Sequence, residues 1–217
     1  MKNNILLIGA GYFGTKVAEK LIEYHQDVML VDIDEERVDD CLGFVTNARI
    51  GDVTNEAFVK SLGVDDYDVC IVAIGDDFMS SLQATALLKD NGARYVVSRA
   101  SSDVQEKFLL RNGADKVIFP ERSYAEWTAI RYANNHVLDY LPLGDDFVIM
   151  EVEVPESWCG RSVRDLKVRS EYGLNIIALR SGEVTRPNVD PDEKLTAEEN
   201  LVVFGRPADI RRCFRIV

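Results

Sequence analysis

The sequence reads Asn4-Ile-Leu-Leu-Ile-Gly-Ala-Gly-Tyr-Phe-Gly14 close to its first residue, and this stretch decides the fold. Its first part is an apolar run of strand length, after which Gly9, Gly11 and Gly14 follow in the spacing GxGxxG. In a strand–turn–helix unit the first glycine permits the tight turn, the second lets backbone amides approach a pyrophosphate, and the third lets the helix pack on the strand. The start of that helix presents free N–H groups to the anion. The stretch therefore predicts a dinucleotide-binding turn.

A carboxylate stands where such a turn requires one. The second apolar run ends in Asp32, 18 residues after Gly14, near the place of the acid that binds the ribose in units of this kind. A carboxylate there accepts hydrogen bonds from the 2′- and 3′-hydroxyls and repels a 2′-phosphate, so it favours a ligand related to NAD or adenosine over one related to NADP. The other interpretation is a glycine turn in a fold that has lost its ligand.

Residues 1–120 alternate short apolar runs with amphipathic segments of helix length. The apolar runs are continuous rather than alternating, which is typical of strands covered on both faces. Six strands separated by five helices predict a doubly wound parallel α/β sheet of Rossmann type. The expected strands are 4–8, 27–32, 48–51, 69–73, 95–99 and 116–119, and the expected helices are 13–24, 34–41, 55–62, 78–91 and 101–112.

The pattern changes after residue 120. Apolar residues at three- and four-residue steps predict one long helix over 121–141. Residues 145–217 then resemble a small α+β domain, with strands expected at 147–154, 174–180 and 201–204, a hairpin return at 183–186, and helical segments at 165–171 and 208–214. The predicted organisation is a nucleotide-binding domain over 1–120, a crossover helix over 121–141 and a C-terminal domain over 145–217.

Composition narrows the classes of partner. The chain has 217 residues, 47% of them hydrophobic, and a formal net charge of −12. Such an acidic surface repels phosphate backbones and anionic headgroups, so we expect neither nucleic acid nor a bare membrane as a partner. The longest apolar stretches fall short of the ~20 residues of a membrane helix, and a strand begins almost at once, so we expect no membrane insertion, no signal peptide and a cytoplasmic location. The four cysteines form no CxxC pair, and Cys70 is expected to be a small buried residue.

The sequence contains few candidates for catalytic residues. A dehydrogenase needs a proton donor beside the nicotinamide, held by a second group. Of the two histidines, His25 is expected in the turn after the first helix and His136 late in the 121–141 helix, away from the strand ends. No histidine lies near Cys159 in the sequence. Binding without chemistry is favoured, and the alternative is an NAD-dependent oxidoreductase with a reduced substrate domain.

Five segments together resemble the RCK (regulator of K⁺ conductance) family. They are GAGYFG at 9–14, DIDEERV at 32–38, GDVT at 51–54, VAIGDD at 72–77 and GADKVIFPE at 113–121. The tail that begins SWCGRSV at 157 is similar to the C-terminal domain of this family. More narrowly, the chain resembles the cytosolic regulatory subunits of bacterial Ktr and Trk potassium transporters.

The resemblance implies a nucleotide-sensing regulatory subunit that is not an enzyme. Members form homodimers through the helix after the Rossmann unit, here 121–141 with Trp127 and Ile130 in its apolar stripe, and the dimers assemble into an octameric ring. The ring docks on an integral-membrane potassium transporter at the inner face of the membrane. ATP, ADP or NAD(H) binds the glycine loop. The implied nucleotide-binding residues are Gly9, Ala10, Gly11, Tyr12, Phe13, Gly14, Asp32, Ile33, Asp52, Val53, Ala73, Ile74, Gly75 and Arg99.

Some of these positions admit two interpretations or depart from the family. Glu121 matches an acid that helps hold a divalent cation, such as Mg²⁺, between subunits in some members, and it is also the acid that any helix start favours. Asp52 could equally cap the helix that follows it. Tyr12 stands where many Ktr-type members carry Arg.

Some relatives bind cyclic di-AMP in the C-terminal domain. Arg169, Asn175, Ile176 and Ile177 fit the pattern of that site. Lys167 and Arg164 depart from it, because an acid and an aliphatic residue are usual at those two positions.

Overall fold

The computed structural model describes residues 2–45, 47–134, 136–144 and 146–216. The chain forms two compact units, Met1–Glu121 and Arg122–Val217, called unit 1 and unit 2 below. Residues 1, 46, 135, 145 and 217, which the expected domain ranges include, lie outside the described residues.

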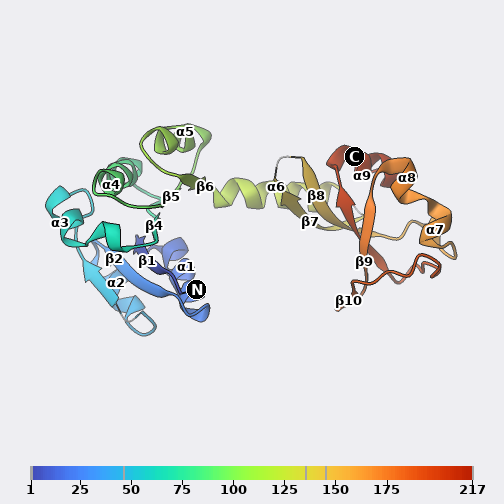
Figure 1. Cartoon of the computed structure of the whole chain (residues 1–217), viewed down its shortest axis with the longest axis horizontal. Coiled ribbons are helices and arrows are strands. Elements are labelled where there is room, and N and C mark those ends of the chain that lie inside the picture. Colours follow the sequence, from blue (N-terminus) through green and yellow to red (C-terminus); the bar gives the residue numbers. More distant parts are fainter. Residues whose placement is uncertain (1, 46, 135, 145, 217) are drawn as a thin grey trace. The chain divides into compact units, whose positions relative to one another are not determined.

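Unit 1 is built on a six-stranded parallel sheet in the order β3-β2-β1-β4-β5-β6 (Figure 1). The order reverses between β1 and β4, as in doubly wound sheets. The predicted fold class is confirmed, and the bounds of the predicted elements differ from those of the structure by at most two residues. The strands are β1 Asn4–Ile8, β2 Asp27–Asp32, β3 Asn47–Ile50, β4 Val69–Val72, β5 Val96–Arg99 and β6 Lys116–Ile118, and the helices are α1 Tyr12–Glu23, α2 Glu35–Cys41, α3 Glu56–Ser61, α4 Phe78–Asp90 and α5 Asp103–Arg111, with a 3₁₀ turn η1 at Val64–Asp66.

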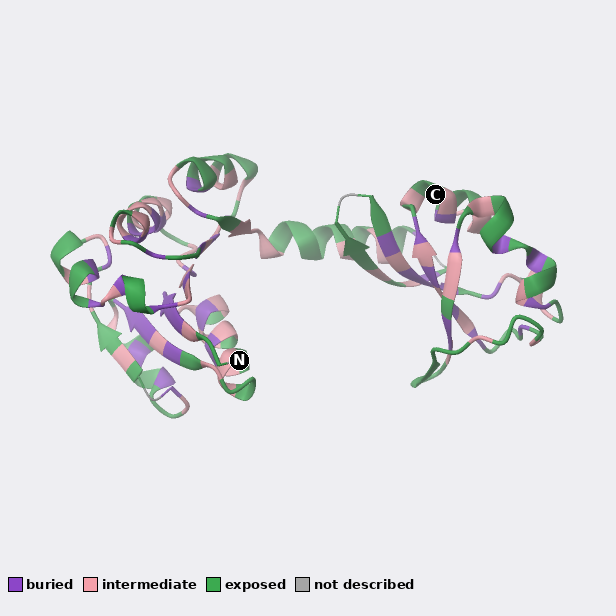
Figure 2. Ribbon diagram, in the orientation of Figure 1, coloured by how far each residue is buried: buried purple, intermediate pink, exposed green. Residues whose placement is uncertain are grey.

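The central strand β1 is apolar and buried from Ile5 to Ile8 because both of its faces are covered. Leu6 belongs to one buried cluster with Val59 of α3 and Leu88 of α4, while its neighbour Leu7 belongs to a second cluster with Ala18 of α1. Successive side chains of a strand point to opposite faces, so each face needs its own apolar layer. Figure 2 shows the resulting buried residues along the strands of this unit.

Unit 2 contains a five-stranded antiparallel sheet in the order β10-β9-β11-β8-β7. Its core gathers residues of the middle strands and the last helix, among them Val152, Leu179, Leu201, Val203 and Ile210. The elements from the end of unit 1 onward are α6 Pro120–Ala133, β7 Val137–Leu143, β8 Phe147–Glu153, η2 Glu156–Trp158, α7 Val163–Leu166, α8 Val168–Tyr172, β9 Asn175–Ser181, β10 Val184–Arg186, β11 Asn200–Gly205 and α9 Pro207–Phe214.

The expectation of one helix over 121–141 is wrong in its last part. Helix α6 ends at Ala133, and Val137–Leu143 form strand β7, which pairs antiparallel with β8. Pro142 has no N–H for a helix, whereas an edge strand such as β7 tolerates proline. His136 therefore lies outside the helix, just before β7, and its Nδ1 is 2.8 Å from Oε2 of Glu153. The apolar spacing of this segment also fits a strand that buries Val137 and pairs with β8.

Among the described residues, no helix combines the length and the apolar character needed to cross a bilayer.

Substitution of Gly14 tests the close packing of α1 on the turn after β1. A Cβ at Gly14 would overlap the carbonyl oxygen of Gly9, whereas a Cβ at Gly43 meets no atom within 4 Å. Overpacking against backbone typically destabilises by about 1–3 kcal/mol, which exceeds the roughly 1 kcal/mol gain in helix propensity from Gly to Ala. We expect Gly14→Ala to lower the melting temperature and Gly43→Ala to leave it nearly unchanged. A Gly14→Ala protein that melts at or above the wild-type temperature would contradict this packing.

Candidate nucleotide-binding site

A cleft of about 460 Å³ lies at the carboxyl ends of the parallel strands of unit 1. This volume falls within the roughly 300–1,000 Å³ of small-molecule sites, and this edge of a doubly wound sheet is where ligands bind. The structure brings 12 of the 14 expected nucleotide-binding residues to this cleft, all except Ala10 and Gly14. The lining residues are Ile8, Gly9, Gly11, Tyr12, Phe13, Val31, Asp32, Ile33, Arg37, Gly51, Asp52, Val53, Thr54, Ala73, Ile74, Gly75, Asp76, Asp77, Ser80 and Arg99.

The glycine loop between β1 and α1 leads into a helix start that no side chain caps. Gly9 adopts φ +102°, and its N–H donates to the carbonyl of Val31 at 2.8 Å. At Gly11 a Cβ would meet no atom within 4 Å, so this position is open to a ligand. Helix α1 has no side-chain cap and no acid in its first turn. In contrast, α2 and α4 begin with capping aspartates. The start of α1 is therefore suited to an anion.

Asp32 ends β2 inside the cleft, and it is 7% exposed. Its Oδ2 accepts a hydrogen bond from the N–H of Ala10 at 2.5 Å, and its Oδ1 accepts one from the N–H of Asp34 at 2.9 Å. Each carboxylate oxygen can accept a second hydrogen bond. Asp32 can therefore hold the glycine loop and bind ribose hydroxyls at the same time.

The structure resolves the two interpretations of Asp52. Its Oδ1 accepts hydrogen bonds from the N–H and the hydroxyl of Thr54, at 2.8 and 2.7 Å. The cap of α3 is Asn55, whose side chain accepts from two N–H groups of the first turn. Asp52 therefore shapes the loop before α3 and lines the cleft, and it does not cap the helix.

A second acid at the rim, Asp77, does cap its helix, α4. The hydroxyl of Ser80 donates to Asp77 Oδ2 at 2.6 Å. This hydrogen bond and those from the backbone N–H groups of Ser80 and Met79 hold the pKa of Asp77 below its usual range. Asp77 stays charged near neutral pH, so the rim at the start of α4 is negative.

Arg99 is the last residue of β5, and its guanidinium lies at the glycine-loop end of the cleft. Its Cζ is 5.2 Å from the centre of the Phe13 ring. Its Nη2 donates to Oε1 of Glu121 in the first turn of α6. Burial alone would raise the pKa of Glu121, but its own backbone N–H and Arg99 outweigh this effect, and the pKa is lowered.

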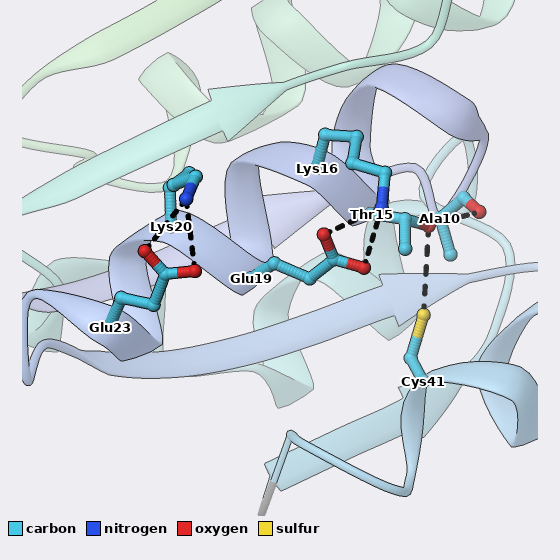
Figure 3. A network of polar contacts seen from close by, with 7 residues as sticks. All are labelled: Ala10, Thr15, Lys16, Glu19, Lys20, Glu23 and Cys41. Carbon is cyan, nitrogen blue, oxygen red and sulfur yellow. Dashed lines mark hydrogen bonds and ion pairs between the residues drawn. The ribbon is translucent and has the colours of Figure 1, made fainter.

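Thr15, in α1, is hydrogen-bonded to the glycine loop, as Figure 3 shows. Its hydroxyl donates to the carbonyl of Ala10 at 3.0 Å, and its oxygen lies 3.7 Å from the sulfur of Cys41. Lys16 and Lys20 on the same helix pair with the glutamates three residues further on. Neither lysine lines the cleft.

The histidines and Cys70 lie outside the cleft. Neither histidine lines the cleft, and Cys70 is fully buried, which raises the pKa of its thiol to about 12. Over the described ranges, no three or more His, Cys, Asp or Glu residues are grouped so that they could hold a metal ion.

Unit 2 has a cleft of its own beside α7, α8 and β9. Arg169, Asn175, Ile176 and Ile177, the residues that fit the cyclic di-AMP pattern, all line it, as do the departing residues Lys167 and Arg164. Arg164 is held in a bidentate pair with Asp192, with N···O distances of 2.6 and 3.0 Å.

Several cleft residues were not among those expected from the sequence. Arg37, Thr54 and Ser80 reach the cleft from the helices or loops that follow β2, β3 and β4. Because helices that follow parallel strands begin at the same edge of the sheet, the first turn after each strand is the signal that could have identified them.

Comparison with known protein families gives two matches that together span most of the chain. The TrkA-N domain matches residues 5–120, and the TrkA-C domain matches residues 149–217.

Curated relatives match over nearly their whole length. The chain is 35% identical to the Ktr system potassium uptake protein C of Bacillus subtilis (strain 168), over 98% of this chain and 96% of that protein. It is 33% identical to the Ktr system potassium uptake protein A of Vibrio alginolyticus, over 94% of this chain and 92% of that protein. The resemblance stated from the sequence motifs is confirmed.

Among solved structures, the GsuK channel bound to NAD is similar with a TM-score of 0.69 and 17% identity, over 98% of this chain and 39% of that chain. At this identity the likeness concerns the fold alone.

Replacement of Asp32 tests the site. We expect Asp32→Ala to weaken the binding of adenosine and ADP by about tenfold or more, since hydrogen bonds to a charged acceptor contribute roughly 1.5–3 kcal/mol. Affinities are measured by calorimetry on the full chain. Asp40→Ala is the matched control, because it removes an exposed acid of α2 that does not line the cleft. Equal affinities for Asp32→Ala and the wild type would show that the site is misassigned.

Proposed function

Since this chain belongs to the family of potassium uptake proteins with TrkA-N and TrkA-C domains, we propose that it is the nucleotide-binding regulatory subunit of a bacterial potassium transporter. The observation that carries the proposal is the cleft of unit 1. It combines an open glycine loop, the uncapped start of α1 and a buried carboxylate at the end of β2, in a chain similar to Ktr proteins over nearly its full length.

The proposed ligand is an adenine nucleotide, either ATP or ADP, or NAD(H). Backbone N–H groups at the start of α1 suit a pyrophosphate, which all of these ligands contain. Asp32 suits a ribose with free hydroxyls. Similar folds have been solved as the GsuK channel bound to NAD and as GsuK bound to ADP. The names of the relatives favour this regulatory function over the oxidoreductase alternative.

In the proposed mechanism, the nucleotide controls ion flow that occurs in another subunit. The chain acts on the cytoplasmic side of the membrane, bound to an integral-membrane transporter. A ligand shifts the conformational equilibrium of such an assembly only if it binds one conformation more tightly than the other.

Self-assembly into dimers and an octameric ring is part of the proposal. In α6, Tyr124 and Tyr132 are exposed, while Ile130 packs against the core of unit 2. The two tyrosines are therefore the residues of this helix that we propose for the contact with a second copy. Glu121 is proposed as one ligand of a divalent cation such as Mg²⁺, and because one carboxylate does not hold such an ion alone, further oxygen ligands would come from the nucleotide, water or a second chain.

Cyclic di-AMP is proposed as a ligand for the cleft of unit 2. The guanidinium of Arg169 suits a phosphate, and the side chain of Asn175 suits a base edge.

Selectivity against a 2′-phosphate tests the direct contact of Asp32 with the ligand. We expect NADP to bind at least about tenfold more weakly than NAD, because the carboxylate of Asp32 repels the added phosphate. Asp32→Ser should shrink this ratio toward one. The ratio of the two dissociation constants is the quantity to measure, since a disturbance of the loop affects both ligands alike. An unchanged ratio in the variant would place the ribose elsewhere.

Potassium uptake in cells tests the proposed function as a whole. In a strain that lacks this chain, growth at limiting potassium should be restored by the wild type and by Asp40→Ala, and only poorly by Asp32→Ala. In parallel, the solution mass of the purified chain should be eight times that of one chain. Uptake that is indifferent to the chain would contradict the proposal.

A further inference from the structure

The cleft of unit 1 contains two arginines, and both are already paired within the chain. Arg37 lies 3.4 Å from the carboxylate of Asp34, and Arg99 pairs with Glu121. The acids that line the cleft are Asp32, Asp52, Asp76 and Asp77. A phosphate-bearing ligand therefore meets positive groups that carboxylates have largely neutralised.

The two pairs differ in what they connect. Asp34 and Arg37 belong to the start of one helix, so that pair joins nothing distant. Arg99 and Glu121, in contrast, join the end of β5 to the first turn of α6, the helix that continues into unit 2. Arg99 thus contacts the cleft on one side and the last residue of unit 1 on the other.

The position of the Arg99 side chain is well defined. It is 20% exposed, whereas the side chain of Glu121 is 53% exposed. The guanidinium stacks on Phe13 in the first turn of α1 and lies so close to Gly75 that a Cβ there would overlap its Nη1. Its Nε is buried and has no hydrogen-bond partner within the part of the chain that is described. The less constrained member of the pair is therefore Glu121.

We propose that Glu121 acts as an internal competitor for Arg99, so that this ion pair lowers the affinity of the cleft for phosphate-bearing ligands. Linkage is reciprocal. The factor by which the Arg99–Glu121 ion pair lowers the affinity for phosphate is therefore also the factor by which bound phosphate weakens that ion pair. Glu121 is then a specificity-determining residue that acts through Arg99, and α6 senses whether the ligand carries phosphate. This inference rests on the proposed binding of adenine nucleotides in the cleft.

A double-mutant cycle on the full chain tests the inference, with ADP as the charged probe and adenosine as the probe without phosphate. EDTA is present throughout, so that a cation held by Glu121 has no part in the result. We expect Glu121→Gln to bind ADP about two- to fivefold more tightly, as the release of a partly exposed ion pair allows. Adenosine should bind equally well to the wild type and to Glu121→Gln.

The Arg99→Gln background decides whether the effect passes through Arg99. We expect Arg99→Gln alone to weaken ADP binding by about tenfold, and the addition of Glu121→Gln to change nothing further. Asp76→Asn is the matched control, because it also removes one acid of the cleft but has no contact with Arg99 among the interactions of the described residues. Its effect on ADP binding should persist in the Arg99→Gln background.

The results that would contradict this inference differ from those that would contradict the proposed nucleotide binding. If Glu121→Gln leaves ADP binding unchanged or weakens it, or if its effect persists without Arg99, the competition is overturned while the proposed function stands. If the wild type binds neither ADP nor adenosine, the proposed binding of adenine nucleotides in the cleft falls, and this inference falls with it.

Discussion

The buried carboxylate of Asp32 holds the glycine loop against the end of β2, and the geometry of the cleft depends on this contact. Its two oxygens accept hydrogen bonds from the N–H groups of Ala10 and Asp34. A charged acceptor makes such bonds stronger than neutral ones, and burial keeps water from replacing them. On the other side, Gly14 packs against the backbone of Gly9. Together these contacts fix where α1 begins, and so where its free N–H groups point.

The sequence predicts unit 1 well because its strands are buried on both faces and its helices carry their own start signals. A continuous apolar run such as β1 is hard to place anywhere except the centre of a covered sheet. Asp34, Asn55 and Asp77 cap three successive helices through their side chains. The segment after Ala133 lacks such local signals. Its strand, β7, exists because of its pairing with β8, and a periodicity of three to four residues cannot reveal a pairing partner.

The candidate site was predictable to the extent that strand ends define it. The end of each strand from β1 to β5 contributes lining residues, and glycine spacing with an acid at the next strand end is a local pattern. The pairing of Arg99 with Glu121 was not predictable, since it joins residues 22 positions apart through side-chain contact alone. The same holds for the role of Asp52, where only the observed bond to Thr54 separates loop shaping from helix capping.

An acidic chain that binds an anion must obtain its affinity from local groups. With a net charge of −12 and four carboxylates around the cleft, the overall field opposes a nucleotide. Backbone N–H groups at the start of α1 offset this repulsion equally for every ligand with a pyrophosphate. Tyr12 adds no positive charge at the glycine loop, where the resemblance implies arginine in many relatives. The free charge of Arg99 then decides how strongly additional phosphate is bound, and Glu121 controls that charge from the first turn of α6.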